Sequence, residues 1–129
     1  MITTRPSIQA LADILGCEPQ IETGPSNLGV LQYDVFYEAE AESLSLSVHP
    51  LAEEIDLRLV TRNPLRSFRL ALADVSSITA IADSEGTRIE IAFFTEDVNS
   101  LHLSLKPRVL FHWGNLKDSP ERHPPWERD

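Results

Sequence analysis

The sequence predicts a mainly β (α+β) domain in which one N-terminal helix precedes an antiparallel meander of about eight short strands. Two observations carry this prediction. Apolar residues recur with a helical period before residue 16, and at every second position from residue 30 onward. One short helix cannot cover so many strands, so we expect the sheet to curve strongly, closing as a barrel or folding over as a sandwich. The 129-residue chain suits one hydrophobic core, and we expect a single domain over residues 1–117.

The helix is expected over about residues 6–15. The apolar residues that share one of its faces are Ile8, Leu11, Ala12 and Leu15. Ser7 or Thr4 can cap its start, and Gly16 can end it because glycine adopts the left-handed cap conformation without a Cβ penalty. The stretch 16–29 is rich in Pro, Gly and Ser, so we expect a loop there.

The segment from about residue 30 to residue 113 alternates between apolar and polar residues. In SLSLSVH, residues 43–49, leucine and valine occupy one face and three serines the other. Because a one-residue slip would turn an apolar face outward, this alternation also determines strand pairing across short loops. The predicted cross-strand pairs include Val48 with Ile55, Ile78 with Ile91, Leu103 with Phe111, and His102 with His112.

Two segments do not fit a simple strand pattern. FYEAEAESL, residues 36–44, moves the apolar side chains from odd to even positions without a Gly, Pro, Asn or Asp that would favour a tight turn. We expect either a bulge near Ala41 or a small loop there. The C-terminal segment 118–129 combines prolines with mixed charge, which predicts a disordered tail.

Charge is distributed unevenly along the chain, whose formal net charge is −9. Residues 1–57 carry ten Asp or Glu and one Arg, whereas residues 58–129 carry ten acidic and ten basic residues. An acidic field repels phosphate backbones, so we expect no nucleic-acid partner. The same field attracts basic proteins and speeds their association.

The sequence shows no membrane or export signal. No apolar run approaches the roughly 18 residues that span a bilayer, and the N-terminal stretch lacks the apolar core and cleavage site of a signal peptide. The single cysteine, Cys17, excludes an internal disulfide and fits a reducing compartment. We therefore expect a cytoplasmic protein in which Cys17 is a packed side chain.

Carboxylates are the first candidate binding groups. Glu38, Glu40 and Glu42 alternate, so on an extended backbone they would project as a row. Such a row discourages edge-to-edge strand pairing, or it docks a basic partner. The carboxylates expected to steer that partner are Asp34, Glu38, Glu40, Glu42, Glu53 and Glu54. A non-catalytic module of this kind, such as an immunity protein or antitoxin, is the first functional hypothesis.

Arginines and histidines suggest a second hypothesis, a β barrel that binds a small ligand or metal and has hydrolytic activity. The basic cluster consists of Arg58, Arg62, Arg66 and Arg69, which would grip an anion or pair with nearby acids. The opposed His102 and His112 suit two metal ligands, or they simply face solvent. In the expected register Ala92 lies opposite His102, and Glu90 is only diagonal to the pair.

No established catalytic motif supports an enzyme. The sequence has no G-x-S-x-G, P-loop, G-x-G-x-x-G, H-E-x-x-H or paired C-x-x-C spacing. The sequence therefore favours a non-catalytic protein, and we expect no cofactor. We expect a monomer, or a homo-oligomer that forms by pairing of edge strands or through an exposed apolar patch. The residues that would form this patch are Phe36, Phe94 and Leu110, which fall on otherwise polar faces.

Overall fold

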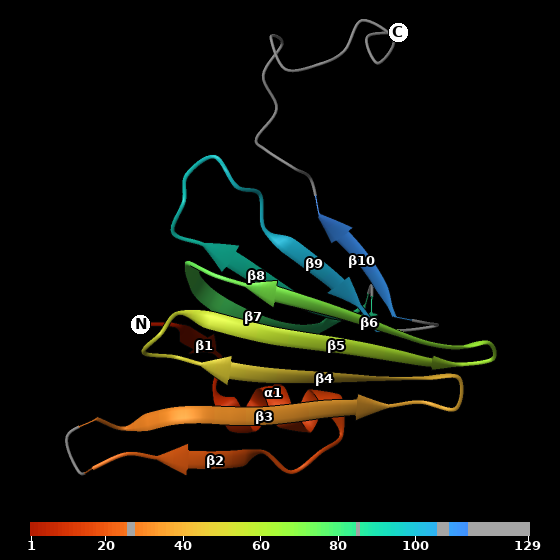
Figure 1. Ribbon diagram of the computed structural model, residues 1–129, viewed down its shortest axis with the longest axis horizontal. Helices are drawn as coiled ribbons and strands as arrows, with labels where there is room; N and C mark the ends of the chain where they lie inside the picture. Colours follow the sequence, from red (N-terminus) through yellow and green to blue (C-terminus); the bar gives the residue numbers. More distant parts are fainter. Residues whose placement is uncertain (26–27, 85, 106–108, 114–129) are drawn as a thin grey trace, which may run out of the picture.

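Two five-stranded sheets and one helix make up the described part of the protein (Figure 1). The computed structural model describes residues 1–25, 28–84, 86–105 and 109–113, so the predicted tail at 118–129 lies outside the described residues. In chain order the elements are β1 (Thr3–Arg5), α1 (Ile8–Leu15), β2 (Gln20–Thr23), β3 (Val30–Glu38), β4 (Glu42–His49), β5 (Glu54–Arg62), β6 (Leu65–Leu72), β7 (Val75–Asp83), β8 (Gly86–Phe93), β9 (Leu101–Ser104) and β10 (Leu110–Trp113). The predicted mainly β fold class is confirmed.

The sheets are two successive meanders that are joined between β6 and β7. One sheet has the strand order β2-β3-β4-β5-β6, and the other has the order β1-β7-β8-β9-β10. Neighbouring strands pair antiparallel except β1 and β7, which are parallel. The sheets share no strand, so the fold is sandwich-like rather than a closed barrel.

The hydrophobic core lies between the inner faces of the two sheets. The predicted hairpin registers place its side chains, since Val48 faces Ile55, and Ile78 faces Ile91. All four of these side chains are buried, and they belong to one continuous cluster. Full burial of one aliphatic side chain contributes about 1.5–3 kcal/mol, so this alternating burial is the main stabilising contribution.

The helix α1 begins at Ile8, two residues later than the earliest predicted start at residue 6. The hydroxyl of Ser7 caps it by accepting a 3.0 Å hydrogen bond from the backbone N–H of Ala10. Gly16 ends it with a φ of 75°, as predicted. Within the described residues, no helix has the length and apolarity needed to cross a membrane.

The two open sides of the sandwich are closed in different ways. On one side α1 packs against β1, β3 and β7, and lies behind β3 in the view of Figure 1. On the other side Phe68 of β6 contacts Phe111 of β10, with ring centroids 5.5 Å apart. Buried side chains from both sheets and from the helix form one continuous cluster between these two sides.

Two strands were absent from the prediction. The stretch 16–29 is not entirely loop, because β2 at Gln20–Thr23 adds an edge strand to β3. The strand β1 pairs in parallel with β7, with Thr3 opposite Ser77. Both strands are short, and neither shows a sustained alternation that sequence reasoning detects.

A buried tyrosine links the two sheets. The hydroxyl of Tyr33 on β3 lies 2.5 Å from the hydroxyl oxygen of Thr4 on β1. Tyr33 is 0% exposed, and its burial raises the pKa of the phenol to about 12, although the hydrogen bond to Thr4 opposes this rise. The neutral phenol is therefore the form that the folded protein stabilises.

We expect stability to fall between about pH 10 and pH 12, because the unfolded tyrosine ionises in this range while folded Tyr33 stays protonated. The total loss from this group approaches about 2–3 kcal/mol. Urea unfolding of the wild type and of Tyr33→Phe across this range isolates the effect. At neutral pH the variant should be about 1 kcal/mol less stable than the wild type, and its stability should lack this component of the pH dependence. If the unfolding free energies of the two proteins fell in parallel between about pH 10 and pH 12, the role given to Tyr33 would be contradicted.

Candidate functional site

The outer face of the β2–β6 sheet, the side turned away from the core, is the candidate binding surface. The alternation that buries the leucines and valine of β4 turns Ser43, Ser45 and Ser47 outward on this central strand. Longer side chains flank these serines on β3 and β5. The facing positions across β3, β4 and β5 are Asp34, Ser47 and Asp56; Phe36, Ser45 and Arg58; and Glu38, Ser43 and Val60.

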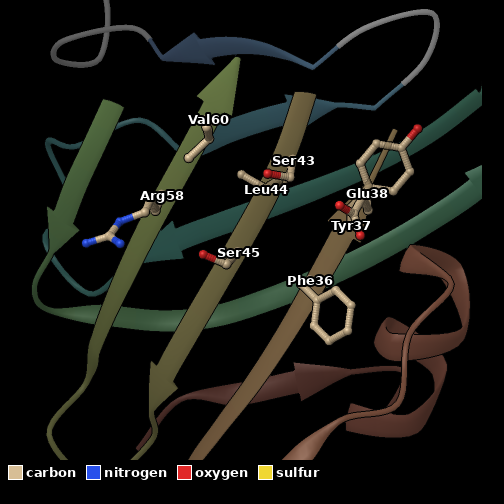
Figure 2. Close-up of a pocket in the computed structure, with 8 residues that line it drawn as sticks. All are labelled: Phe36, Tyr37, Glu38, Ser43, Leu44, Ser45, Arg58 and Val60. Carbon is tan, nitrogen blue, oxygen red and sulfur yellow. The ribbon is translucent and has the colours of Figure 1, made fainter. Parts of the chain in front are cut away.

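The middle of this face is sunken, because the serine side chains are short. A hollow of about 230 Å³ lies there, lined by residues of β3, β4 and β5. Figure 2 shows Ser43 and Ser45 along its floor, with Phe36 and Arg58 on the strands to either side. Phe36 is 44% exposed, so much of its ring is open to contact. The hollow combines an aromatic surface, hydroxyl groups and a guanidinium.

Arg58 has no ion pair to any described residue, whereas Arg62 and Arg69 each have one. The residues facing Arg58 are Ser45 on β4 and Arg69 on β6. Arg69 is itself held by Asp56, whose two carboxylate oxygens accept hydrogen bonds from Nε at 2.9 Å and Nη2 at 2.5 Å. The donors of Arg58 are therefore available to an acceptor on a partner.

The arginines predicted to bind an anion are Arg58, Arg62, Arg66 and Arg69. They do not converge on one point, because Arg66 faces Thr61 and therefore lies on the other face of the sheet from the remaining three. Arg69 and Arg62 pair with Asp56 and Glu38, as the alternative interpretation predicts. The hydrogen bond from Arg69 lowers the pKa of Asp56, and the same bond raises the pKa of Arg69. This ion pair stays charged at neutral pH.

Arg62 explains how the chain reverses between β3 and β4 without a typical turn residue. Residues 39–41 form a small loop rather than a bulge. The Arg62 guanidinium donates hydrogen bonds to the carbonyl oxygens of Ala39 and Glu40, and at 2.8 Å to the carboxylate of Glu38. One side chain from β5 thus satisfies the polar groups of the loop.

The predicted row of carboxylates at Glu38, Glu40 and Glu42 is wrong, because this loop redirects successive side chains. Glu38 pairs with Arg62, and Glu40 is exposed in the loop. Glu42 starts β4 and points inward, where it is 6% exposed and accepts a hydrogen bond from the backbone N–H of Val109. Glu42 is therefore absent from the exposed surface and instead connects the two sheets.

The other predicted carboxylates lie near one end of the outer face. Asp34 is half-buried, and the amide nitrogen of Gln32 lies 3.3 Å from each of its carboxylate oxygens. Glu53 lies 2.6 Å from the N-terminal ammonium of Met1. Glu54 is exposed on β5 and has no ion pair among the described residues. Of these groups, Asp34 and Glu54 have no basic partner in the described part of the chain.

Sequence reasoning missed Glu22, which belongs to the same face. It faces Gln32 across β2 and β3, and therefore shares the side of the sheet that carries Asp34. Glu22 is exposed and forms no ion pair with the described part of the chain. Its strand β2 lies within a stretch rich in Gly and Pro, a composition that predicts a loop rather than a strand.

The two histidines face each other as predicted, with ring centroids 6.4 Å apart. The predicted register with β8 is wrong: Glu90, not Ala92, lies directly opposite His102. Across residues 1–25, 28–84, 86–105 and 109–113, no three His, Cys, Asp or Glu side chains already form a metal-binding group. The described residues therefore give no ready-made centre for metal-assisted hydrolysis.

Phe36, Phe94 and Leu110 do not form the predicted shared patch. Each is exposed, at 44%, 54% and 51%. However, Phe36 belongs to the β2–β6 sheet, Leu110 belongs to β10 in the other sheet, and Phe94 follows β8. Phe36 and Leu110 are on the outward faces of the two opposed sheets, so they do not share one continuous apolar surface.

Comparison with known proteins supports the fold. No protein-family model matches the sequence, and no curated protein sequence matches it. A solved chain from a contact-dependent growth inhibition toxin–immunity protein complex of Klebsiella pneumoniae 342 is similar, with a TM-score of 0.67 and 15% sequence identity. The similarity covers 88% of this chain and 96% of that chain. The two chains therefore share their architecture over nearly their whole length.

Replacing Arg62 by lysine should lower the free energy of unfolding by about 1–2 kcal/mol, because an ammonium cannot reproduce the forked contacts with the loop. Urea unfolding at neutral pH measures the change. Arg66→Lys is the matched control, since Arg66 is exposed and holds no loop; its effect should stay below about 0.5 kcal/mol. Equal losses in the two variants would contradict the role given to Arg62.

Proposed function

We propose that the protein is a non-catalytic cytoplasmic binding module that engages a basic protein through the outer face of its β2–β6 sheet. One concrete form of this role is that of an immunity protein that binds and neutralises a toxin. The observation that carries the proposal is a sheet face with a hollow lined by an exposed aromatic ring and by an arginine, with carboxylates around it. Within the described part of the chain, neither this arginine nor these carboxylates form an ion pair.

The distribution of charge supports a basic partner. The chain has a net charge of −9, and its excess of acid falls within residues 1–57. Those residues include β2, β3 and β4, which are three of the five strands of the candidate face. Glu22, Asp34 and Glu54 have no ion-pair partner among the described residues, whereas Arg62 and Arg69 compensate the carboxylates of Glu38 and Asp56. The uncompensated groups would steer a basic protein toward this face.

The composition of the hollow supports tight contact after the encounter. Aromatic residues and arginine are the side chains that most often dominate binding energy when they lie near the centre of an interface. Phe36 and Arg58 hold that place here, with small serines between them that allow close approach. The acidic groups around them then govern the rate of association, and these two anchors govern how slowly the complex dissociates.

The structural comparison supports the particular form of the role. The similar chain comes from a complex between a growth-inhibition toxin and its immunity protein. A shared architecture does not by itself transfer a function. The open face and the acidic excess are features of this chain, and they suit the same task independently of the comparison.

The first experiment captures a partner from an extract of the source cells on the immobilised protein at low salt, and then measures association rates with the purified partner. We expect a basic protein whose association slows as salt is added. The combined variant Glu22→Gln, Asp34→Asn and Glu54→Gln should slow association about tenfold. Arg58→Ala should instead mainly speed dissociation.

A matched variant removes three charges from the other sheet and its adjoining loop, through Glu90→Gln, Glu96→Gln and Asp97→Asn. It has the same net charge as the first variant, so it separates steering by the face from steering by overall charge. Association should slow no more than about threefold. Equal slowing in both variants, or a rate that ignores salt and both sets of substitutions, would contradict the proposed surface.

A further inference from the structure

A row of metal-ligating side chains crosses the outer face of the second sheet. Glu90 on β8 lies opposite His102 on β9, and His102 lies opposite His112 on β10. Figure 1 shows these three strands side by side at the edge of that sheet. Neither histidine nor Glu90 forms a hydrogen bond or ion pair with the described residues, so all three remain available.

The spacing of the two imidazoles fits a chelate after a small side-chain rotation. Their centroids are 6.4 Å apart and their planes are inclined at 44°. A metal–nitrogen distance of about 2.1 Å, with bond angles of roughly 90–110°, places the centroids of two ligating rings about 4.5–5.3 Å apart. Rotation about the χ angles must therefore close the gap by only about 1–2 Å, and both side chains are exposed and able to move.

We propose that His102 and His112 chelate one divalent transition-metal ion, with water completing its coordination. Imidazole pairs suit Ni²⁺, Cu²⁺ and Zn²⁺, whereas Mg²⁺ and Ca²⁺ prefer oxygen ligands. Glu90, directly across from His102, adds negative charge beside the ion. The site is a two-histidine chelate, which agrees with the lack of a preformed group of three ligands among the described residues.

The chelate would link an edge strand to its neighbour. In the described sheet β10 pairs with β9 alone, so a metal bound by both strands adds a cross-strand link where the sheet ends. An ion that binds the folded protein and not the unfolded chain raises stability in proportion to its occupancy. The site lies on the sheet opposite the proposed partner surface, so it does not depend on that function.

Isothermal titration of the full chain with NiCl2 at pH 7.5, in a buffer that does not coordinate metal, tests the proposal. We expect one ion per chain, with affinity lowered at least tenfold by His102→Ala and by His112→Ala. Glu90→Gln should weaken binding about two- to fivefold through the lost charge. The matched controls are His49→Ala on the other sheet and His123→Ala outside the described residues, and each should stay within about twofold of the wild type.

Thermal unfolding gives a second measurement of metal binding that is independent of the heat recorded in the titration. Nickel at about 100 times its Kd should raise Tm by about 5–10 °C. EDTA should reverse this rise, and neither single-histidine variant of the pair should show it. Absence of a Tm rise, binding that survives loss of His102 or His112, or binding lost with His123 would each overturn the proposal.

Discussion

The candidate surface depends on one constraint, the burial of alternate residues of β3, β4 and β5 against the opposite sheet. A one-residue slip of β4 would turn its leucines and valine to water and bring Ser43, Ser45 and Ser47 into the core. Each aliphatic side chain lost from the core costs about 1.5–3 kcal/mol, and each unpaired hydroxyl adds a further cost. The core thereby determines which side chains face outward. The hollow between Phe36 and Arg58 exists because the strand between them must present its serines to solvent.

The alternation of apolar and polar residues predicts the pairing of strands that a short hairpin loop connects. Where a loop has few residues, parity and loop length together leave one register, which is why Val48 meets Ile55 as expected. Longer-range pairing has no comparable signal. The three residues of β1 pair with a strand that begins at Val75, and nothing local to β1 indicates this. The link from β6 to β7 is as short as a hairpin loop, yet the chain passes there from one sheet to the other. The periodicity of apolar residues does not distinguish such a crossing from a hairpin.

For the candidate sites, too, the sequence predicts which face of a strand a side chain occupies, but not which distant segment that side chain contacts. The alternation of β5 predicts which face of the sheet each of its arginines occupies. It does not predict that Arg62 donates hydrogen bonds to the loop between β3 and β4. The inward turn of Glu42 depends on that loop. The seven residues between β8 and β9 leave their register undetermined, and a shift of two residues preserves parity. Glu90 therefore replaced Ala92 opposite His102 without disturbing the alternation.

The two outer faces differ in chemistry, and this difference allows a direct test of where a protein partner binds. Backbone and side-chain NMR spectra of the isotope-labelled protein, recorded with and without the purified protein that the capture experiment returns, report every affected position at once. A partner on the β2–β6 face predicts the largest shift changes at Phe36, Ser45 and Arg58, with β8 and β9 little affected. Changes concentrated on β8, β9 and β10, with the signals around the hollow unmoved, would contradict this assignment.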